Sequence, residues 1–481
     1  MSLIETLGLK ESPFRKDSVF VGATKNGGKM QLEYMSFDDL RLHTSILGAT
    51  GTGKTVLLTT MITQFIRNGW GVLLLDMKFD PAMFRSAWAT ACICGREKDF
   101  KLLSPFGVES ERGVLGEYGT CSYNPLLGID SPIAATAAIL KAAAKDKAGD
   151  AYWEGVKEGI VDTLVRAFLS TGLPYSFKDL WAALESPTAL GRLLNISKDP
   201  EANLILADWL SKVNHYDPRV RADHDKYVQG AKMFFRTLGT GTLGTLLNSY
   251  DSDVSLKKAY RDNQIIWAVL PSLQIDHTAK SMGKLILSEL RYLAGEIQAT
   301  METRKPFLVV VDEFENFVFP GMTDLFDKGR GAGISMVIAN QSPAQIDLEH
   351  SKEMRAVITA NTRNKIVMAT EDPDIAKFFA ELTGKDDTAI SFNFDGFGMR
   401  EADQYLIQPR VFTEMDDFSM VLRKKGVTKR GHVVALPTDW ELGVDVPRPR
   451  FEPTIFREGG VRLWEQVQGA GPAIPARSAK K

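Results

Sequence analysis

The segment GATGTGKT at positions 48–55 constrains the fold of this 481-residue chain more than any other feature. It meets the pattern GxxxxGK[ST], in which glycines let the backbone curl so that successive N–H groups face bound phosphates. The lysine of this pattern neutralises the β- and γ-phosphates, and the following hydroxyl ligates Mg²⁺. A short apolar run precedes the segment, and apolar residues at helical spacing follow it over residues 56–68. We therefore predict a strand, P-loop and helix that bind ATP and Mg²⁺ through Gly48, Thr50, Gly51, Gly53, Lys54 and Thr55.

A second apolar run, residues 307–312, ends in two carboxylates, Asp312 and Glu313. An acidic residue at the end of a buried strand can hold Mg²⁺, and the next carboxylate can polarise the attacking water. Apolar strands that end in Asp-Glu are common, so this signal gains its weight from the complete P-loop. We predict Asp312 and Thr55 as metal ligands and Glu313 as a catalytic residue beside Lys54.

Two further polar residues follow later in the chain. Gln341 comes after the apolar run 334–339, where it is either an ordinary strand-end residue or a group that orients water and senses hydrolysis. Arg330 stands in KGRGAG at positions 328–333, which predicts a glycine-flanked turn. It is either a surface charge or an arginine finger that reaches the γ-phosphate of a neighbouring subunit.

The order of apolar runs predicts the fold class. Runs at 71–76, 264–270, 307–312, 334–339 and 364–369 read as buried strands separated by helical stretches, which favours an open, mostly parallel sheet with helices on both faces. From about residue 131 to 262 the sequence is helical, and SFKD at 176–179 resembles a capping box. We predict an α/β protein in which an all-α domain is inserted into a P-loop sheet domain of the RecA-like class. The predicted boundaries are 1–130 and 263–446 for the sheet domain, 131–262 for the insertion and 447–481 for an extended or disordered tail.

Composition and missing motifs exclude several alternatives. The net charge of −2 is too small for a uniformly basic nucleic-acid binder, so any polyanion site has to be a local patch. The three cysteines fit a reducing compartment better than a disulfide framework. No run approaches the ~18 apolar residues of a membrane span. The nearest match to the NKxD motif that reads guanine has Val367 in place of the aspartate, which argues against a GTPase. The sequence has no LSGGQ-like segment, which argues against an ABC-type ATPase.

With these motifs in place, the sequence from about residue 40 to 440 resembles the type IV secretion coupling proteins. These are the TraG/TraD-like DNA-pumping ATPases of conjugation, in the superfamily of the FtsK and HerA motors. Their motifs resemble HTSILGATGTGKT at 43–55, LDMK at 75–78, YNPL at 123–126, GRGAGISMVIANQSPAQ at 329–345 and NTRNK at 361–365 followed by DIAK at 374–377.

The resemblance implies roles for the residues already singled out. Lys54 and Thr55 become phosphate and Mg²⁺ ligands, Asp312 the carboxylate on the metal side and Glu313 the water activator. Gln341 becomes the sensor and Arg330 the finger in trans. Such a finger implies a ring, usually a homo-hexamer, around a channel through which DNA passes.

The expected function is therefore an ATP-hydrolysing DNA translocase that delivers single- or double-stranded DNA, with or without a relaxase, to a conjugation channel. One alternative is a motor or adaptor for protein effectors, with the insertion recognising secretion signals. Another is a HerA-like DNA-processing ATPase with a nuclease partner. Many coupling proteins begin with two transmembrane helices, whereas about forty residues precede this P-loop. We therefore expect a cytoplasmic chain, peripheral at the inner membrane through a membrane-anchor or channel subunit.

Overall fold

The computed structural model describes most of the chain and divides it into two compact units. The described residues are 13–26, 29–108, 113–143, 151–270, 272–300, 304–342, 346–347, 351–386, 390–392, 399–401, 404–436, 446–454 and 460–466. Unit 1 consists of Met1–Leu102, Leu256–Gly283 and Leu290–Pro449. Unit 2 consists of Leu103–Ser255, Lys284–Glu289 and Arg450–Lys481. The domain boundaries given above from the sequence stay predictions.

Unit 1 is built on a sheet that has eleven strands in the described part of the chain. The strands are β1 (Ser18–Asn26), β2 (Lys29–Ser36), β3 (Thr44–Leu47), β4 (Gly71–Asp76), β5 (Phe100–Leu103), β6 (Ile265–Val269), β7 (Phe307–Asp312), β8 (Ile334–Asn340), β9 (Asn364–Val367), β14 (Ser419–Lys424) and β15 (Val427–His432). Their order is β2-β1-β15-β14-β9-β3-β8-β7-β4-β6-β5.

The centre of this sheet is parallel and buried. β3 pairs in parallel with β8 and β9, and β7 pairs in parallel with β8 and β4. β6 pairs in parallel with the other side of β4. Strands β3, β4, β6 and β8 are buried along their whole length, as their continuous apolar runs predict. Strands β14, β15, β1 and β2 extend the sheet with antiparallel pairs. β1 and β2 form an antiparallel hairpin, and residues 27 and 28 lie outside the described part.

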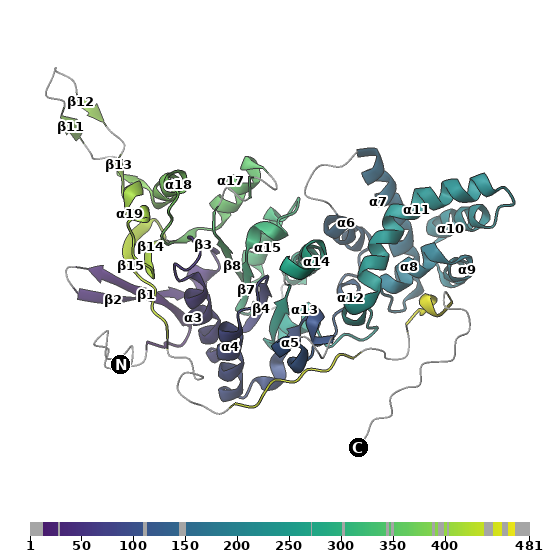
Figure 1. The fold of residues 1–481 in the computed structure, drawn as a ribbon, viewed down its shortest axis with the longest axis horizontal. Coiled ribbons are helices and arrows are strands. Elements are labelled where there is room, and N and C mark those ends of the chain that lie inside the picture. Colours follow the sequence, from purple (N-terminus) through teal and green to yellow (C-terminus); the bar gives the residue numbers. More distant parts are fainter. Residues whose placement is uncertain are drawn as a thin grey trace. The chain divides into compact units, whose positions relative to one another are not determined.

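Helices cover both sides of the parallel strands. Figure 1 shows α3 and α4 on one side of β3, β8, β7 and β4, with α15 and α17 on the other. The helices of this unit are α2 (Phe37–Leu40), α3 (Lys54–Arg67), α4 (Pro81–Ile93), α13 (Leu256–Asp262), α14 (Ser272–Thr300), α15 (Thr323–Gly331), α17 (Lys352–Asn361), α18 (Pro373–Thr383) and α19 (Pro409–Thr413). Short turns η1 (Glu97–Asp99) and η4 (Phe314–Phe317) and the strand pairs β10 (Lys385–Asp386) with β13 (Gln404–Tyr405) and β11 (Ile390–Phe392) with β12 (Met399–Glu401) complete it.

Unit 2 is helical, which confirms the predicted α/β class with an inserted helical region. Its elements are η2 (Pro105–Val108), α5 (Gly113–Tyr118), η3 (Pro125–Leu127), α6 (Pro132–Ala143), α7 (Ala151–Thr171), α8 (Phe177–Glu185), α9 (Pro187–Ile196), α10 (Pro200–Val213), α11 (Pro218–Gly239), α12 (Gly241–Leu247) and η5 (Leu463–Gln466). The predicted capping box is present, because the Ser176 hydroxyl accepts from the Asp179 N–H and the Asp179 carboxylate accepts from the Ser176 N–H.

Many of these helices start at the same local signal. An Asp or Ser accepts backbone N–H groups at the N-cap, and the next residue is a proline whose missing N–H costs nothing at that position. This dipeptide starts α4, α9, α10, α11 and α18, at Asp80, Ser186, Asp199, Asp217 and Asp372.

The described part of the C-terminal segment is bound within unit 2. Thr454 donates its N–H to Asp253, and Leu463 donates its N–H to the buried carboxylate of Asp179 at 2.7 Å. Leu463 itself is fully buried. Residues 446–454 are extended, whereas η5 is a short helical turn.

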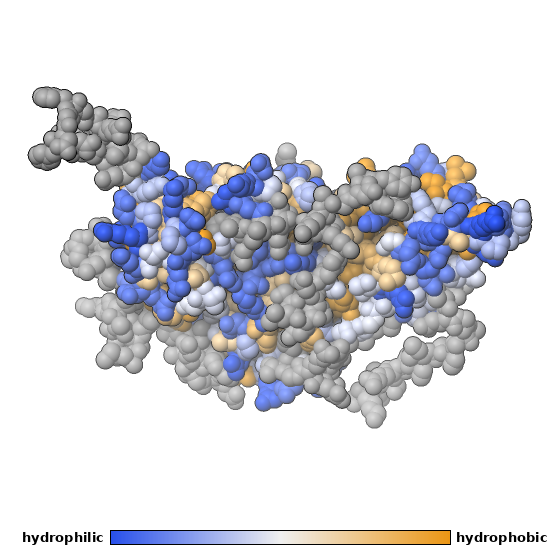
Figure 2. Space-filling view, turned by 45° about the horizontal axis from the view of Figure 1, so that its top comes forward, coloured by the Kyte–Doolittle hydropathy of each residue, from blue (hydrophilic) through white to orange (hydrophobic). Residues whose placement is uncertain are grey.

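The surface mixes polar and apolar side chains. The space-filling view in Figure 2 shows apolar areas interspersed with hydrophilic ones on the face drawn. In unit 2 the exposed large apolar residues include Leu204, Ile205, Tyr216, Tyr227 and Met233. None of the described helices combines the length and apolar composition needed to cross a membrane.

Candidate nucleotide-binding site

The P-loop joins the end of β3 to the start of α3. Gly51 and Gly53 adopt φ angles of 86° and 109°, a backbone region that favours glycine. A Cβ on Gly53 would lie 2.9 Å from the ring of Phe418, whose N–H also donates to the Thr52 carbonyl. A Cβ on Gly51 would meet nothing within 4 Å, so the opposite side of the loop is open. Phe418 therefore supports one side of the loop and leaves the other side accessible to a ligand.

Lys54 is the first residue of α3 and turns back towards the loop. Its ammonium donates to the carbonyls of Gly48 at 2.5 Å and Ala49 at 2.8 Å. Burial lowers the pKa of Lys54, while the charge of Asp312 opposes this shift. Thr50 and Thr55 are exposed beside it. The loop residues thus place one ammonium group and exposed hydroxyls at a single open face, which suits phosphate groups.

The predicted carboxylates lie at the same edge of the sheet. Asp312 ends β7, and its carboxylate accepts the Glu313 N–H at 3.1 Å. Burial raises the pKa of Asp312, against the opposing charge of Lys78. Glu313 has a φ of 49°, which is uncommon for a non-glycine residue and marks local backbone strain.

Lys78 completes this cluster, although the sequence assigned it no role. It follows β4, and its ammonium lies 2.6 Å from a carboxylate oxygen of Glu313. Burial lowers the pKa of Lys78, but the hydrogen bond and charge of Glu313 outweigh it and raise the pKa overall. The turn that carries Lys78 is held by Asp76, whose buried carboxylate accepts the N–H groups of Lys78 at 3.1 Å and Phe79 at 2.8 Å. Burial raises the pKa of Asp76 to about 6.

A further carboxylate, Glu315, also faces this cluster. It is buried and accepts a hydrogen bond from the Asn340 amide at 3.1 Å. Its charge acts on both Lys54 and Lys78, so the carboxylates outnumber the ammonium groups around the site. Carboxylate and hydroxyl oxygens are the ligands that Mg²⁺ prefers.

The donors present fit a magnesium ion that is shared with a nucleotide. Within the described ranges no three His, Cys, Asp or Glu side chains converge as a protein-only cage. Mg²⁺ commonly takes one or two protein ligands and completes its shell with waters and substrate phosphates. Thr55 and Asp312 supply a hydroxyl and a carboxylate of that kind.

Strand pairing places Gln341 at this edge too. β8 lies between β3 and β7, with Asn340 opposite Leu47 and Ala339 opposite Asp312. Gln341 is the next residue and is half-buried. It therefore follows the strand between the P-loop strand and the acidic strand, at the same end of the sheet.

Arg330 lies elsewhere, and its predicted turn is wrong. It stands in the last turn of α15, because the helix continues through Lys328 and Gly329 to Gly331 before β8 begins. Its neighbour is His43, at the start of β3, whose ring contacts the Phe326 carbonyl at 2.7 Å and accepts the Met336 N–H at 3.0 Å. Arg330 is exposed at the amino end of β8, and at ~3.3 Å per residue the seven-residue strand separates it from Gln341 by about 20 Å.

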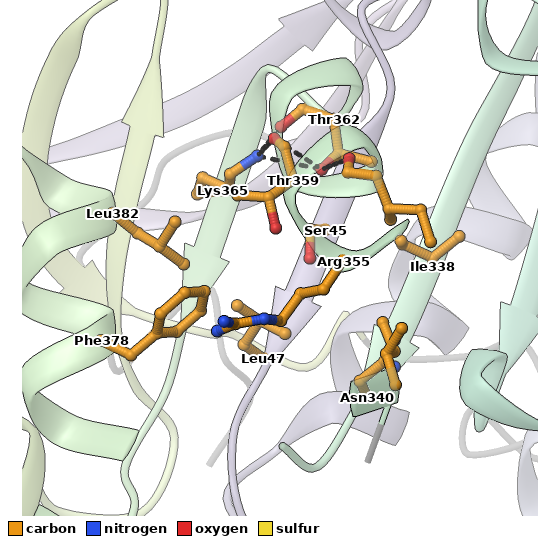
Figure 3. Close-up of a pocket in the computed structure, with 12 residues that line it drawn as sticks. Ser45, Leu47, Ile338, Asn340, Arg355, Thr359, Thr362, Lys365, Phe378 and Leu382 are labelled. Carbon is orange, nitrogen blue, oxygen red and sulfur yellow. Dashed lines mark hydrogen bonds between the residues drawn. The ribbon is translucent and has the colours of Figure 1, made fainter. Parts of the chain in front are cut away.

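A small cavity lies under α17 and α18 in the same unit. It holds about 20 Å³ and is lined by β3, β8, β9 and the two helices, including Leu47, Asn340, Arg355 and Phe378 (Figure 3). The buried amino group of Lys365 donates to the carbonyls of Thr359 and Thr362 and so binds the end of α17. The space suits about one water molecule and is too small for a nucleotide.

Comparison with known proteins matches two parts of the chain to family models. Residues 306–406 match the family model described as the TraM recognition site of TraD and TraG. Residues 23–80 match the model of the central domain of the helicase HerA. A relative, the type 4 coupling protein DotL of Legionella pneumophila, is 23% identical over 440 residues, which cover 82% of this chain and 55% of DotL.

These matches support a place for the chain in the type IV coupling protein family. It spans about half of the length of DotL. The fold of the chain is similar to that of the bacterial conjugative coupling protein TrwBdeltaN70, with a TM-score of 0.59 and 15% identity over 90% of this chain and 92% of that one. It is also similar to VirB4 of Thermoanaerobacter pseudethanolicus, with a TM-score of 0.54 and 13% identity over 89% of this chain and all of that one.

Sequence reasoning left out several members of this coupling protein's site. Lys78 was noted only as part of the LDMK segment, while Glu315, Asn340 and Phe418 carried no signal. Their positions depend on which strands are neighbours, because β4 lies far from β7 and β8 in the chain. Among these four residues Lys78 alone has a local signal, since it stands two residues after a strand that ends in Asp76.

Proposed function

We propose that this coupling protein is an ATPase that uses MgATP hydrolysis to move DNA towards a type IV secretion channel. The observation that carries the proposal is the sheet order β3-β8-β7, which brings Lys54, Asp312, Glu313 and Gln341 to one edge. Solved structures of the relative TrwB in complex with an ATP analogue, and with ADP and Mg²⁺, support nucleotide binding at this fold.

In this proposal each residue of the edge has a separate task. Lys54 leaves the carbonyls of Gly48 and Ala49 to neutralise phosphate oxygens, and the Gly48, Thr50, Gly51 and Gly53 backbone lines the phosphates. Thr55 and Asp312 hold Mg²⁺, which stabilises the charge that develops on the transferred phosphoryl group. Glu313 accepts the proton of the attacking water, and Gln341 orients that water.

The position of Arg330 supports the assembly that we propose. An exposed arginine about 20 Å from its own catalytic edge serves hydrolysis only from a neighbouring subunit. We therefore propose a homo-oligomeric ring, a hexamer as expected for the family, with relaxase and channel or membrane-anchor subunits as partners. In this proposal the ring is cytoplasmic and reaches the inner membrane through those partners.

The test is the rate of ATP hydrolysis without nucleic acid and with single- or double-stranded DNA, alongside mass measurement of the assembly. We expect stimulation by DNA that is insensitive to its sequence and that falls steeply with salt, because phosphate contacts dominate. No stimulation by either DNA, together with stimulation by a secretion substrate protein, would replace DNA by protein as the cargo. Copurification with a nuclease would instead favour a DNA-processing role.

A further inference from the structure

The backbone turn that carries Lys78, the partner of Glu313 in an ion pair, is held by hydrogen bonds to Asp76. Asp76 is fully buried and receives the backbone N–H groups of Lys78 and Phe79, and the indole N–H of Trp267 at 3.2 Å. The turn is thereby fixed, while the Lys78 side chain remains 52% exposed. A rigid backbone under a half-exposed side chain lets the ammonium change partners without moving the strand.

Lys78 approaches the carboxylates from the side opposite the P-loop. In the sheet order β3-β8-β7-β4, the P-loop follows β3, Asp312 ends β7, and Lys78 follows β4. Both ammonium groups act on Asp312, and Lys78 also lowers the pKa of Lys54 through its charge, after the larger effect of burial. The two cations therefore flank the carboxylates from opposite sides, and their mutual repulsion favours an anion between them.

We propose that Lys78 senses the terminal phosphate of ATP. Without ATP it pairs with Glu313, and when ATP binds it exchanges Glu313 for an oxygen of the γ-phosphate, which leaves Glu313 available to the attacking water. This inference rests on the proposed ATPase function and adds to it a residue that distinguishes ATP from ADP.

The charges explain the direction of the exchange. Glu313 is only 16% exposed, so in the nucleotide-free protein it needs a nearby cation. A terminal phosphate carries more negative charge than one carboxylate and presents several acceptor oxygens, so it competes well for an ammonium group. The P-loop lysine already serves the β-phosphate. ADP has no γ-phosphate, so no phosphate oxygen competes with Glu313 for Lys78.

The test compares the affinity of the Mg²⁺ complexes of ADPNP, a non-hydrolysable ATP analogue, and of ADP. We expect Lys78→Met to weaken ADPNP binding by at least about tenfold, the usual size of a charge-assisted hydrogen bond, and to change ADP binding by less than about twofold. Lys78→Arg should restore most of the ADPNP affinity because it keeps the charge. Equal effects on both nucleotides, or none on ADPNP, would refute the inference.

The matched control is Lys257→Met. Lys257 forms a similar half-exposed pair with Glu296 at 3.2 Å, but it precedes β6 and so lies at the other end of the strands. We expect this variant to bind both nucleotides as the wild type does. A wild type that binds neither nucleotide would overturn the proposed function itself, whereas a wild type that binds both, with Lys78→Met altering them alike, would overturn only the role of Lys78.

A double-mutant cycle tests the exchange directly. In the Glu313→Gln background Lys78 is no longer held, so its transfer to phosphate costs less. Lys78→Met should therefore weaken ADPNP binding more in this background than in the wild type. Equal or smaller weakening would show that Lys78 keeps its contact with Glu313 while ATP is bound, and would refute the exchange.

Discussion

Replacing Arg330 by alanine tests whether this coupling protein works as a ring. Arg330 is exposed in the last turn of α15, about 20 Å along β8 from the edge that carries Gln341. It therefore cannot contact a nucleotide in its own P-loop. If it serves a neighbouring subunit, its loss should slow hydrolysis by ~10³–10⁵, which is about 4–7 kcal/mol of transition-state stabilisation. Nucleotide affinity and fold should change little, because an exposed side chain is worth roughly 0.5 kcal/mol or less.

The assay is the steady-state ATPase rate of mixed assemblies. Subunits with Arg330→Ala retain a sound P-loop, and subunits with Lys54→Ala retain the arginine, so mixed rings should recover activity that neither variant shows alone. Mass measurement has to confirm that the subunits exchange. Lys328→Ala is the matched control, because Lys328 is an exposed cation of the same helix turn. A wild-type rate for Arg330→Ala, or no recovery in rings shown to be mixed, would refute the reasoning.

Three further predictions test single residues. Lys54→Ala should abolish hydrolysis and leave the circular dichroism and melting temperature near wild type, because the hydrogen bonds of its ammonium within the described residues go to the loop carbonyls of Gly48 and Ala49. Turnover within tenfold of wild type would contradict its role. Glu313→Gln should keep ATP binding and lower turnover by at least ~10², measured by single-turnover hydrolysis. Lys365→Met should remove a pH dependence of stability. Burial lowers the pKa of Lys365 from 10.5 to about 7. Between pH 7 and 10.5 the unfolded chain therefore binds more protons than the folded chain, so rising pH stabilises the wild type. Over this range the free energy of unfolding increases by at most ~5 kcal/mol. A gap between the two melting temperatures that stays constant from pH 7 to 10 would show that Lys365 is not buried as the free amine.

The parallel strands and the P-loop were predictable because their signals are local. Residues 48–55 carry the full pattern, and the runs that form β4, β7 and β8 are continuous and apolar because they are buried on both faces. The capping box at Ser176 is equally local, since its partners are three residues apart. The antiparallel strands β14 and β15 were missed, because β15 is largely exposed and shows little apolar pattern. The two strands are joined by a turn at Lys425 and Gly426, both with positive φ.

The sequence by itself therefore determined which elements form and which of them can bind phosphate, since periodicity, caps and glycine loops act within a few residues of one another. Only the tertiary structure decided which side chains meet. Lys78 pairs with Glu313 because β4 and β7 are neighbours in the sheet, although they are far apart in the chain. Arg330 and Gln341 are eleven positions apart in the sequence, yet they lie at opposite ends of strand β8. Strand order is set by packing of the whole core, and no local pattern encodes it.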